Sequence, residues 1–118
     1  MKNIKFILTK FDNPIFFHYL SLFLHNKQVK NMKRIVIFAS GSGTNAENII
    51  QYFSATKIAS VVAVFTNKAD AKVIERAHKY GVSTHIFTKI DLESGKVVQE
   101  VSALEPDLIV LAGFLLKL

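Results

Sequence analysis

An apolar strand, a glycine turn and a helix follow one another without interruption in this chain, and this unit constrains the fold most. The run Arg34–Ala39 is short and apolar, as in a buried parallel strand. The turn Ser40-Gly-Ser-Gly-Thr-Asn45 follows it directly. Apolar residues then recur at helical spacing, at Ala46, Ile49, Ile50 and Phe53. Such a unit predicts an α/β fold.

The alternation continues to the end of the chain. Further strands are expected at Ile58–Phe65, Val82–Phe87 and Asp107–Ala112, with helices between about Asp70 and Gly81 and near Glu93–Leu104. The apolar residues predicted to be buried in these two helices are Val73, Ile74, Ala77, Val97, Val98, Val101 and Leu104. We therefore predict a Rossmann-like, open, mostly parallel sheet of about four strands with flanking helices. Its ligands are expected at the carboxyl ends of the strands.

The glycine turn predicts an anion site. Gly41 and Gly43 can adopt positive φ and carry no Cβ, so a ligand can approach the peptide N–H groups at the start of the helix. The unpaired donors and the helix dipole favour a phosphate there, and Asn45 adds a side-chain amide. The alternative is that Thr44 and Glu47 form a capping box that satisfies the same donors.

Two nucleotide-binding motifs are less consistent with the turn. The residues from Gly41 to Ala46 fit the dinucleotide-binding motif Gly-x-Gly-x-x-Ala. However, a dinucleotide site also needs an acidic residue about 20 residues further on, which binds the ribose hydroxyls. The second strand instead ends at Ala63-Val-Phe-Thr-Asn67, and Asp70 is expected to cap the next helix. A nucleoside triphosphatase is disfavoured because Gly-x-x-x-x-Gly-Lys-Ser/Thr does not occur.

The composition gives no nucleic-acid or metal signal. The formal net charge is +6, but residues 1–31 carry five lysines and one aspartate, which is +4 of that total. The absence of cysteine excludes thiolate chemistry and is consistent with a reducing cytoplasm. The histidines have no metal-ligand spacing with acidic neighbours and are expected as ordinary surface or loop residues: His18, His25, His78 and His85. No metal, nucleic acid or membrane partner is therefore expected.

Residues 1–31 differ in character from the rest. They contain no glycine and show no clear periodicity. The apolar run Ile15–Leu24 is too short to span a bilayer, and no small-x-small cleavage site of a signal peptide follows it. We interpret 1–31 as an extension, disordered or not translated in the cell, with Met32 as initiator and 32–118 as the domain. A disordered or interfacial arm is the alternative.

Four sequence blocks follow one another along the chain: Ser40-Gly-Ser-Gly-Thr-Asn45, Phe65-Thr-Asn-Lys-Ala-Asp-Ala71, Glu75-Arg-Ala77 and Val110-Leu-Ala-Gly-Phe114. In this order they resemble the amino-terminal half of the phosphoribosylglycinamide formyltransferase family. The resemblance covers Met32 to Leu118. It implies an enzyme of purine (IMP) biosynthesis that transfers a formyl group from 10-formyltetrahydrofolate to glycinamide ribonucleotide.

The resemblance also implies roles for individual residues. The ribonucleotide phosphate would lie on Gly43, Thr44 and Asn45, and the folate pteridine against Leu115, Leu116, Lys117 and Leu118. Many members carry arginines near the positions of Lys96 and Leu116, so ionic contacts to the folate tail are not implied for this chain. Lys68, Asp70 and Arg76 are expected to be solvated or capping residues. The family's catalytic Asn-x-His pair and later aspartate are not found in this chain.

The chain is therefore expected to be a fragment that binds poorly and is inactive alone, with the outer edge of its last strand unpaired and a carboxyl-terminal half as its missing partner. Another folate formyltransferase or a formyltetrahydrofolate hydrolase is a weaker candidate, because neither needs a phosphate turn. A non-catalytic phosphate-binding or split-enzyme partner domain is the alternative from a different class. An adjacent reading frame that encodes Asn-x-His and a later aspartate would favour the enzyme.

The assignment of Met32 as initiator predicts the mass of the endogenous protein. If translation begins there, mass spectrometry of the intact protein isolated from its own cells will find a species without residues 1–31. A mass that includes Met1 through Asn31 would contradict the assignment.

Overall fold

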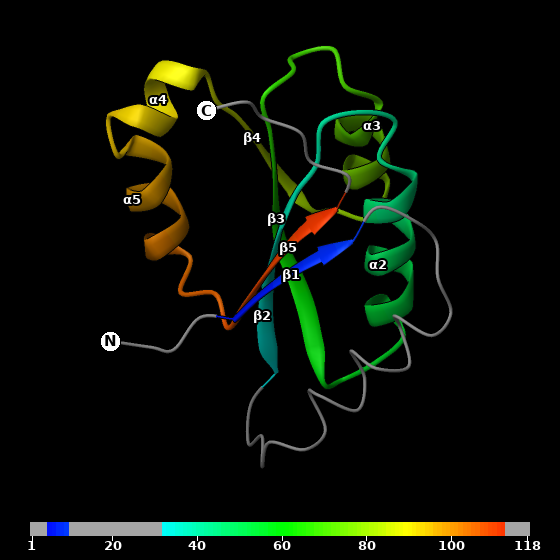
Figure 1. Ribbon diagram of the computed structural model, residues 1–118. Coiled ribbons are helices and arrows are strands. Elements are labelled where there is room, and N and C mark those ends of the chain that lie inside the picture. Colours follow the sequence, from blue (N-terminus) through cyan, green and yellow to red (C-terminus); the bar gives the residue numbers. More distant parts are fainter. Residues whose placement is uncertain (1–4, 10–31, 113–118) are drawn as a thin grey trace.

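Within the part of the chain that the structure describes, five parallel strands form one open sheet in the order β1-β5-β2-β3-β4 (Figure 1). The computed structural model describes residues 5–9 and 32–112. The strands are β1 (Lys5–Thr9), β2 (Lys33–Phe38), β3 (Ala59–Thr66), β4 (Ser83–Ile86) and β5 (Leu108–Ala112). The helices are α2 (Thr44–Ser54), α3 (Lys72–Lys79), α4 (Lys89–Glu93) and α5 (Lys96–Ala103).

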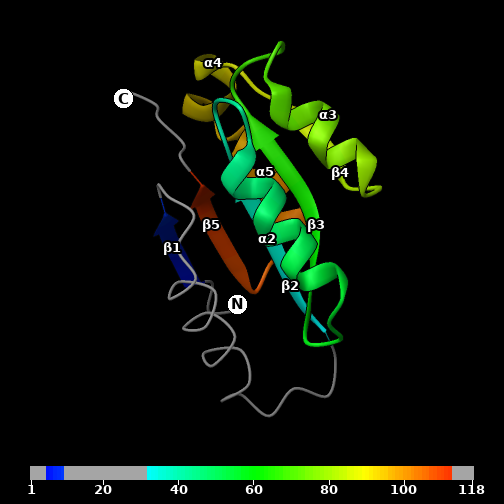
Figure 2. The same cartoon turned by 90° about the vertical axis from the view of Figure 1, so that its right-hand side faces the viewer.

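The sheet is covered on both faces. Helices α2 and α3 lie on one face, and α4 and α5 lie on the other (Figures 1 and 2). Ile35 and Ile37 of β2 belong to the core under α2 and α3, whereas Val36 and Phe38 belong to the core under α5. Alternate residues of one strand thus enter two different cores, which explains why the strand is apolar at successive positions.

The predicted elements are largely confirmed. Each of the four expected strands is present, and its bounds differ by at most one residue at either end. The predicted apolar stripe of α2 is fully buried, at Ala46, Ile49, Ile50 and Phe53. The parallel pairing of all these strands confirms the expected Rossmann-like α/β architecture.

The helix predicted near Glu93–Leu104 is present as α5 but is shorter, and one of its residues was misplaced. It begins after Gly95, its N-cap with φ of +89°, and a separate short helix, α4, precedes it and ends at Glu93. Val98, which was expected to be buried, is 61% exposed, whereas Val97 and Val101 are buried. A helix of eight residues that packs with one face cannot bury adjacent valines equally.

The strand β1 was not predicted. It pairs in parallel with β5 along the whole length of that strand, from Lys5 opposite Leu108 to Thr9 opposite Ala112. The expectation that the outer edge of β5 is unpaired is therefore wrong. A local pattern could not have indicated this pairing, because its partners lie about 100 residues apart in the sequence.

The strand order places a topological switch point between β2 and β5. From β2 the chain proceeds outward through β3 to β4, and it then returns to the other side of β2 as β5. The backbone N–H of Asp107 donates to the Arg34 carbonyl at 2.8 Å, and the Asp107 carboxylate accepts from the Arg34 N–H at 2.8 Å. These bonds join the amino ends of β2 and β5. Because the two strands are parallel, the chain leaves both at the same end of the sheet.

Among the described residues, no helix combines the length and the apolar character that crossing a membrane requires.

Candidate anion-binding site

The glycine turn leaves β2 at its carboxyl end and leads directly into α2. Gly43 is the N-cap of this helix, with φ of +77°, and its carbonyl accepts the Glu47 N–H at 2.8 Å. A Cβ on Gly43 would lie 2.5 Å from the Cβ of Val73 on α3. The position therefore requires glycine for two reasons, the left-handed backbone and the closeness of the neighbouring helix.

The capping-box interpretation of Thr44 and Glu47 is wrong. Helix α2 begins one residue earlier than that motif requires, and its N-cap Gly43 provides no side-chain cap. The Thr44 hydroxyl lies 3.1 Å from the Ser42 hydroxyl. The Glu47 carboxylate contacts residues of α3 instead of returning to the backbone. The side chains that were expected to compete with an anion for the first turn are thus engaged elsewhere.

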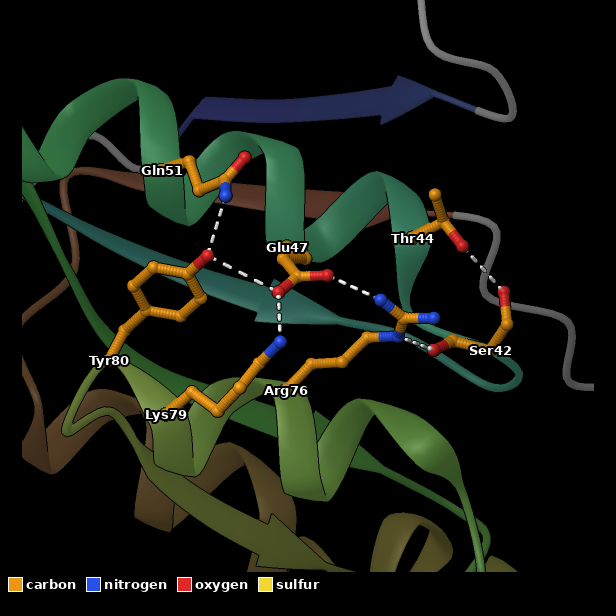
Figure 3. A network of polar contacts seen from close by, with 7 residues as sticks. All are labelled: Ser42, Thr44, Glu47, Gln51, Arg76, Lys79 and Tyr80. Carbon is orange, nitrogen blue, oxygen red and sulfur yellow. Dashed lines mark hydrogen bonds and ion pairs between the residues drawn. The ribbon is translucent and has the colours of Figure 1, made fainter.

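Arg76 joins the turn to α2 and was not predicted to do so. Its Nε donates to the Ser42 carbonyl at 2.7 Å, and its Nη1 pairs with a Glu47 carboxylate oxygen (Figure 3). The other Glu47 oxygen lies 2.9 Å from the Lys79 Nζ and accepts from the Tyr80 hydroxyl at 3.2 Å. Arg76 was expected to be a solvated or capping residue, but it is a structural clamp that holds the turn from α3.

The bond from Arg76 also orients a peptide of the turn. In a trans peptide the carbonyl and the following N–H point in opposite directions. Because the Ser42 carbonyl is directed at Arg76, the Gly43 N–H is directed away from α3. A side chain on the neighbouring helix thereby sets the direction of a donor in the glycine turn.

A second bond fixes the beginning of the turn. The Ser40 hydroxyl donates to the Asn67 side-chain oxygen at 2.8 Å, and the Ala39 N–H donates to the Phe65 carbonyl at 3.0 Å. Ser40 and Asn67 each follow a strand, β2 and β3, and these strands are neighbours in the sheet. Ser40 and Asn67 are polar residues that directly follow neighbouring parallel strands, and such residues meet at the same end of a sheet. This contact could therefore have been predicted from the sequence.

The charge on Glu47 is stabilised by its neighbours. The hydrogen bond from Lys79 lowers the pKa of the Glu47 carboxyl most, and the bond from Arg76 lowers it further, whereas burial opposes them. The side chain of Glu47 is 12% exposed and that of Arg76 is 31% exposed, so water screens this pair only in part. Arg76 and Lys79 of α3 are thus both engaged with one carboxylate of α2.

The remaining predicted site residues are dispersed. Lys68 and Asp70 are exposed, and Asp70 does not cap α3, whose N-cap is Ala71 without a side-chain bond. Lys96 is exposed at the start of α5. The proposed pteridine segment lies outside the described residues and consists of Leu115, Leu116, Lys117 and Leu118.

The two histidines within the described ranges differ. His78 is exposed, whereas His85 is partly buried. The imidazole of His85 stacks on Phe65 with ring centroids 4.5 Å apart, and its Nδ1 lies 3.6 Å from a Glu100 carboxylate oxygen. His85 therefore packs between the sheet and α5 and is not an ordinary surface residue. The described residues contain no group of three or more metal-ligating side chains.

A hollow of about 240 Å³ lies at the end of the sheet opposite to the glycine turn, where the strands begin. It is lined by residues at the amino ends of the strands and at the end of α2, among them Met32, Phe53, Ala59 and Val82. The glycine turn lies at the carboxyl ends of the strands, so this hollow is separate from the turn.

These features define the class of protein: a doubly wound α/β domain with a glycine turn suited to an anion at the switch point of its sheet. The sequence matches the formyl transferase family over residues 33–118, so the chain belongs to that family. Gly43, Thr44 and Asn45 lie consecutively in this domain, as the N-cap and the first two residues of α2.

Individual relatives and solved structures agree with this membership. The phosphoribosylglycinamide formyltransferase of Escherichia coli K12 is 39% identical over 87 residues, which is 69% of this chain and 41% of that protein. The crystal structure of the Brucella melitensis enzyme of the same name has a TM-score of 0.70 at 35% identity and is matched over 75% of this chain and 49% of its own. The crystal structure of glycinamide ribonucleotide transformylase 1 of Geobacillus kaustophilus has a TM-score of 0.67 at 34% identity. The match covers 75% of this chain and 50% of that chain. The chain spans about half the length of these relatives.

Replacement of Gly43 by alanine tests the geometry of the turn. The left-handed backbone costs a residue with a Cβ about 1–2 kcal/mol, and the overlap with Val73 adds to this cost. We expect Gly43→Ala to lower the free energy of unfolding by at least about 2 kcal/mol in urea titrations. A second substitution, Val73→Ala, will not restore the stability of Gly43→Ala, because the atoms nearest to the added Cβ are the Cβ and Cα of Val73, which alanine keeps.

Gly41→Ala is the matched control for this variant. A Cβ at Gly41 meets nothing within 4 Å, so we expect a change within about 0.5 kcal/mol. Equal effects at the two glycines would contradict the geometry described for the turn.

The depressed pKa of Glu47 predicts a pH dependence. The carboxylate stabilises the folded state above its ordinary pKa of 4.5, and this stabilisation is lost as the pH falls through the lowered folded value. We expect Glu47→Gln to lower the melting temperature at neutral pH, with a difference from the parent that narrows below pH 4.5. Thermal unfolding of both proteins between about pH 3 and about pH 8 measures this difference in melting temperature.

Glu93→Gln is the control, because the pair between Glu93 and Lys89 is exposed and 3.8 Å long. We expect little change from this variant at any pH. A Glu47→Gln curve that runs parallel to the parent over the whole range would contradict the role of the ionised carboxylate.

Proposed function

We propose that this chain is the phosphate-binding half of a phosphoribosylglycinamide formyltransferase, an enzyme of purine biosynthesis that transfers a formyl group from 10-formyltetrahydrofolate to glycinamide ribonucleotide. The observation that carries the proposal is the start of α2. In a chain of the formyl transferase family, Gly43, Thr44 and Asn45 lie together at the carboxyl edge of β2 with no side-chain cap at Gly43.

In this proposal the peptide groups of the turn hold the ribonucleotide phosphate. Gly43 and Thr44 donate backbone N–H groups, and Asn45 adds its side-chain amide, while the dipole of α2 favours the negative charge. Arg76 acts as a positioning residue, because it orients the Ser42–Gly43 peptide without itself contacting the phosphate. Arg76 and Lys79 of α3 both pair with Glu47, so the proposed site selects a phosphate chiefly by the geometry of its donors.

The formyl transfer itself requires further groups. The amine of the ribonucleotide attacks the formyl carbon, the carbonyl oxygen becomes an oxyanion, and the folate nitrogen leaves as it gains a proton. The step needs a donor for the oxyanion and a proton carrier, and Asn-x-His does not occur in the 118 residues. We therefore propose that this chain alone binds the ribonucleotide weakly and does not transfer the formyl group.

The folate would be held at Leu115, Leu116, Lys117 and Leu118, with a carboxyl-terminal half as the partner that completes the site. The cytoplasm is the proposed location, since the chain has no cysteine and both substrates are soluble metabolites. A rival formyltransferase or a formyltetrahydrofolate hydrolase would not require the ribonucleotide, so binding of that ligand separates the candidates.

Calorimetric titration of the full chain with glycinamide ribonucleotide tests the proposal. We expect binding of the ribonucleotide and of ribose 5-phosphate, and a loss of about tenfold or more with the unphosphorylated riboside, because charge-assisted bonds to the phosphate are lost. We expect Asn45→Ala to weaken binding by about tenfold. An assay with 10-formyltetrahydrofolate should show no transfer.

Gln99→Ala is the matched amide control, because Gln99 is exposed on α5, on the other face of the sheet. Equal affinity for the ribonucleotide and its riboside would contradict a phosphate site at the turn. Folate-dependent formyl transfer by the chain alone would contradict the proposal that its catalytic residues are missing.

A further inference from the structure

Glu47 of α2 holds the glycine turn in two ways. Its backbone N–H donates to the Gly43 carbonyl at 2.8 Å, which is the bond that the N-cap residue accepts from the helix. Its carboxylate pairs with the Nη1 of Arg76, whose Nε donates to the Ser42 carbonyl at 2.7 Å (Figure 3). The carbonyls of two consecutive residues of the turn, Ser42 and Gly43, are thus both tied to Glu47.

These two carbonyls belong to the peptide groups whose N–H groups are the proposed phosphate donors. The Ser42 carbonyl shares a peptide plane with the Gly43 N–H, and the Gly43 carbonyl shares the next plane with the Thr44 N–H. A contact that fixes the direction of a carbonyl therefore also fixes the N–H in the same plane. The Thr44 donor is held by a backbone bond, whereas the Gly43 donor depends on the side chains of Arg76 and Glu47.

The Glu47 carboxylate is itself held in one direction. Its second oxygen lies 2.9 Å from the Lys79 Nζ and accepts from the Tyr80 hydroxyl at 3.2 Å. The Gln51 side chain in turn donates to this hydroxyl at 2.6 Å. Because the side chain of Glu47 is also only 12% exposed, the carboxylate presents its first oxygen to Arg76 in a defined orientation.

The charge of Glu47 does not by itself favour an anion at the turn. The dipole of α2 stabilises an acid in its first turn, but that acid repels a phosphate bound at the same helix end. A favourable effect of Glu47 on phosphate binding therefore comes from the orientation of the donors, which opposes the effect of its charge.

We infer that Glu47 is a positioning residue of the proposed phosphate site, which acts through Arg76 to direct the Gly43 N–H at the phosphate. The inference rests on the proposed function, in which Gly43 and Thr44 donate to the ribonucleotide phosphate. The two possible roles of Glu47 have opposite signs. Loss of the carboxylate strengthens phosphate binding if its charge decides the affinity, and weakens binding if the orientation of the donor decides it.

Calorimetric titration of the full chain with ribose 5-phosphate tests the inference. We expect Glu47→Ala and Arg76→Ala each to bind about tenfold more weakly than the parent, because one charge-assisted bond to the phosphate loses its alignment. The double variant should bind within about twofold of either single variant, because both residues act on the same peptide. Tighter binding by Glu47→Ala, or a loss of about a hundredfold in the double variant, would overturn the inference.

Lys79→Ala is the matched control, because it removes the same charge from the same helix. Lys79 is 62% exposed and pairs with the other oxygen of Glu47, so its loss leaves the contacts of Arg76 with Glu47 and Ser42 in place. We expect the affinity to change by less than about twofold. Equal losses from Lys79→Ala and Arg76→Ala would mean that charge alone sets the affinity, and would overturn the inference.

Arg76→Lys keeps the charge and remains informative if Arg76→Ala does not fold. A single ammonium group cannot reproduce the planar pair of bonds that the guanidinium makes to the Ser42 carbonyl and Glu47. We therefore expect the same loss of about tenfold. An affinity equal to that of the parent would contradict the positioning role.

Backbone relaxation measured by NMR without ligand separates this inference from the proposed function. We expect the order parameter of the Gly43 N–H to fall from about 0.85 to below about 0.6 in Glu47→Ala, while that of the Thr44 N–H stays at about 0.85. If the parent does not bind ribose 5-phosphate, the proposed function fails, and the order parameters alone decide whether Glu47 positions the turn. An unchanged order parameter at Gly43, or an equal fall at both residues, would overturn the inference.

Discussion

The close contact between Gly43 and Val73 is the constraint on which the site depends. Because Gly43 has no side chain, α3 can approach the turn so closely that an added Cβ would overlap the Val73 backbone and Cβ. Arg76 lies one turn further along α3 and therefore reaches both the Ser42 carbonyl and Glu47. One small residue thus determines where α2 begins and which side chains hold the loop before it.

The fold could be predicted from the sequence where a pattern is local. The stripe from Ala46 to Phe53 and the apolar run of β2 each reflect burial within a single element, and both are confirmed. The prediction failed for Val98 and for β1. Helix α5 packs with the one face that carries Val97 and Val101, which leaves Val98 exposed, and the pairing of Lys5–Thr9 depends on a strand at the far end of the chain. Register between distant segments leaves no periodic signal in either one.

The site was predicted less completely than the fold. The glycine turn and its place at the start of a helix follow from the residue types, and the structure contains both. The role of Glu47 was misread, because the local spacing fits a capping box while the carboxylate pairs with Arg76 and Lys79. Ion pairs between elements far apart in sequence prevail here over a local motif. The same reason explains why Arg76 was not identified as a clamp.

Several contacts that hold the turn come from a contiguous part of the chain. Among the residues that the structure describes, Ser40 bonds to Asn67, Ser42 to Arg76, and Glu47 to α3, and these partners lie between β2 and the end of α3. None of these supports requires a residue beyond β4. If the turn holds a phosphate, as proposed, these contacts would fix its cradle within this part of the family's sheet. Formyl transfer needs in addition a proton carrier and a donor for the oxyanion, and the Asn-x-His pair that the proposal assigns to these tasks is not among the 118 residues. In this proposal, binding of the ribonucleotide and transfer of the formyl group are physically separable tasks.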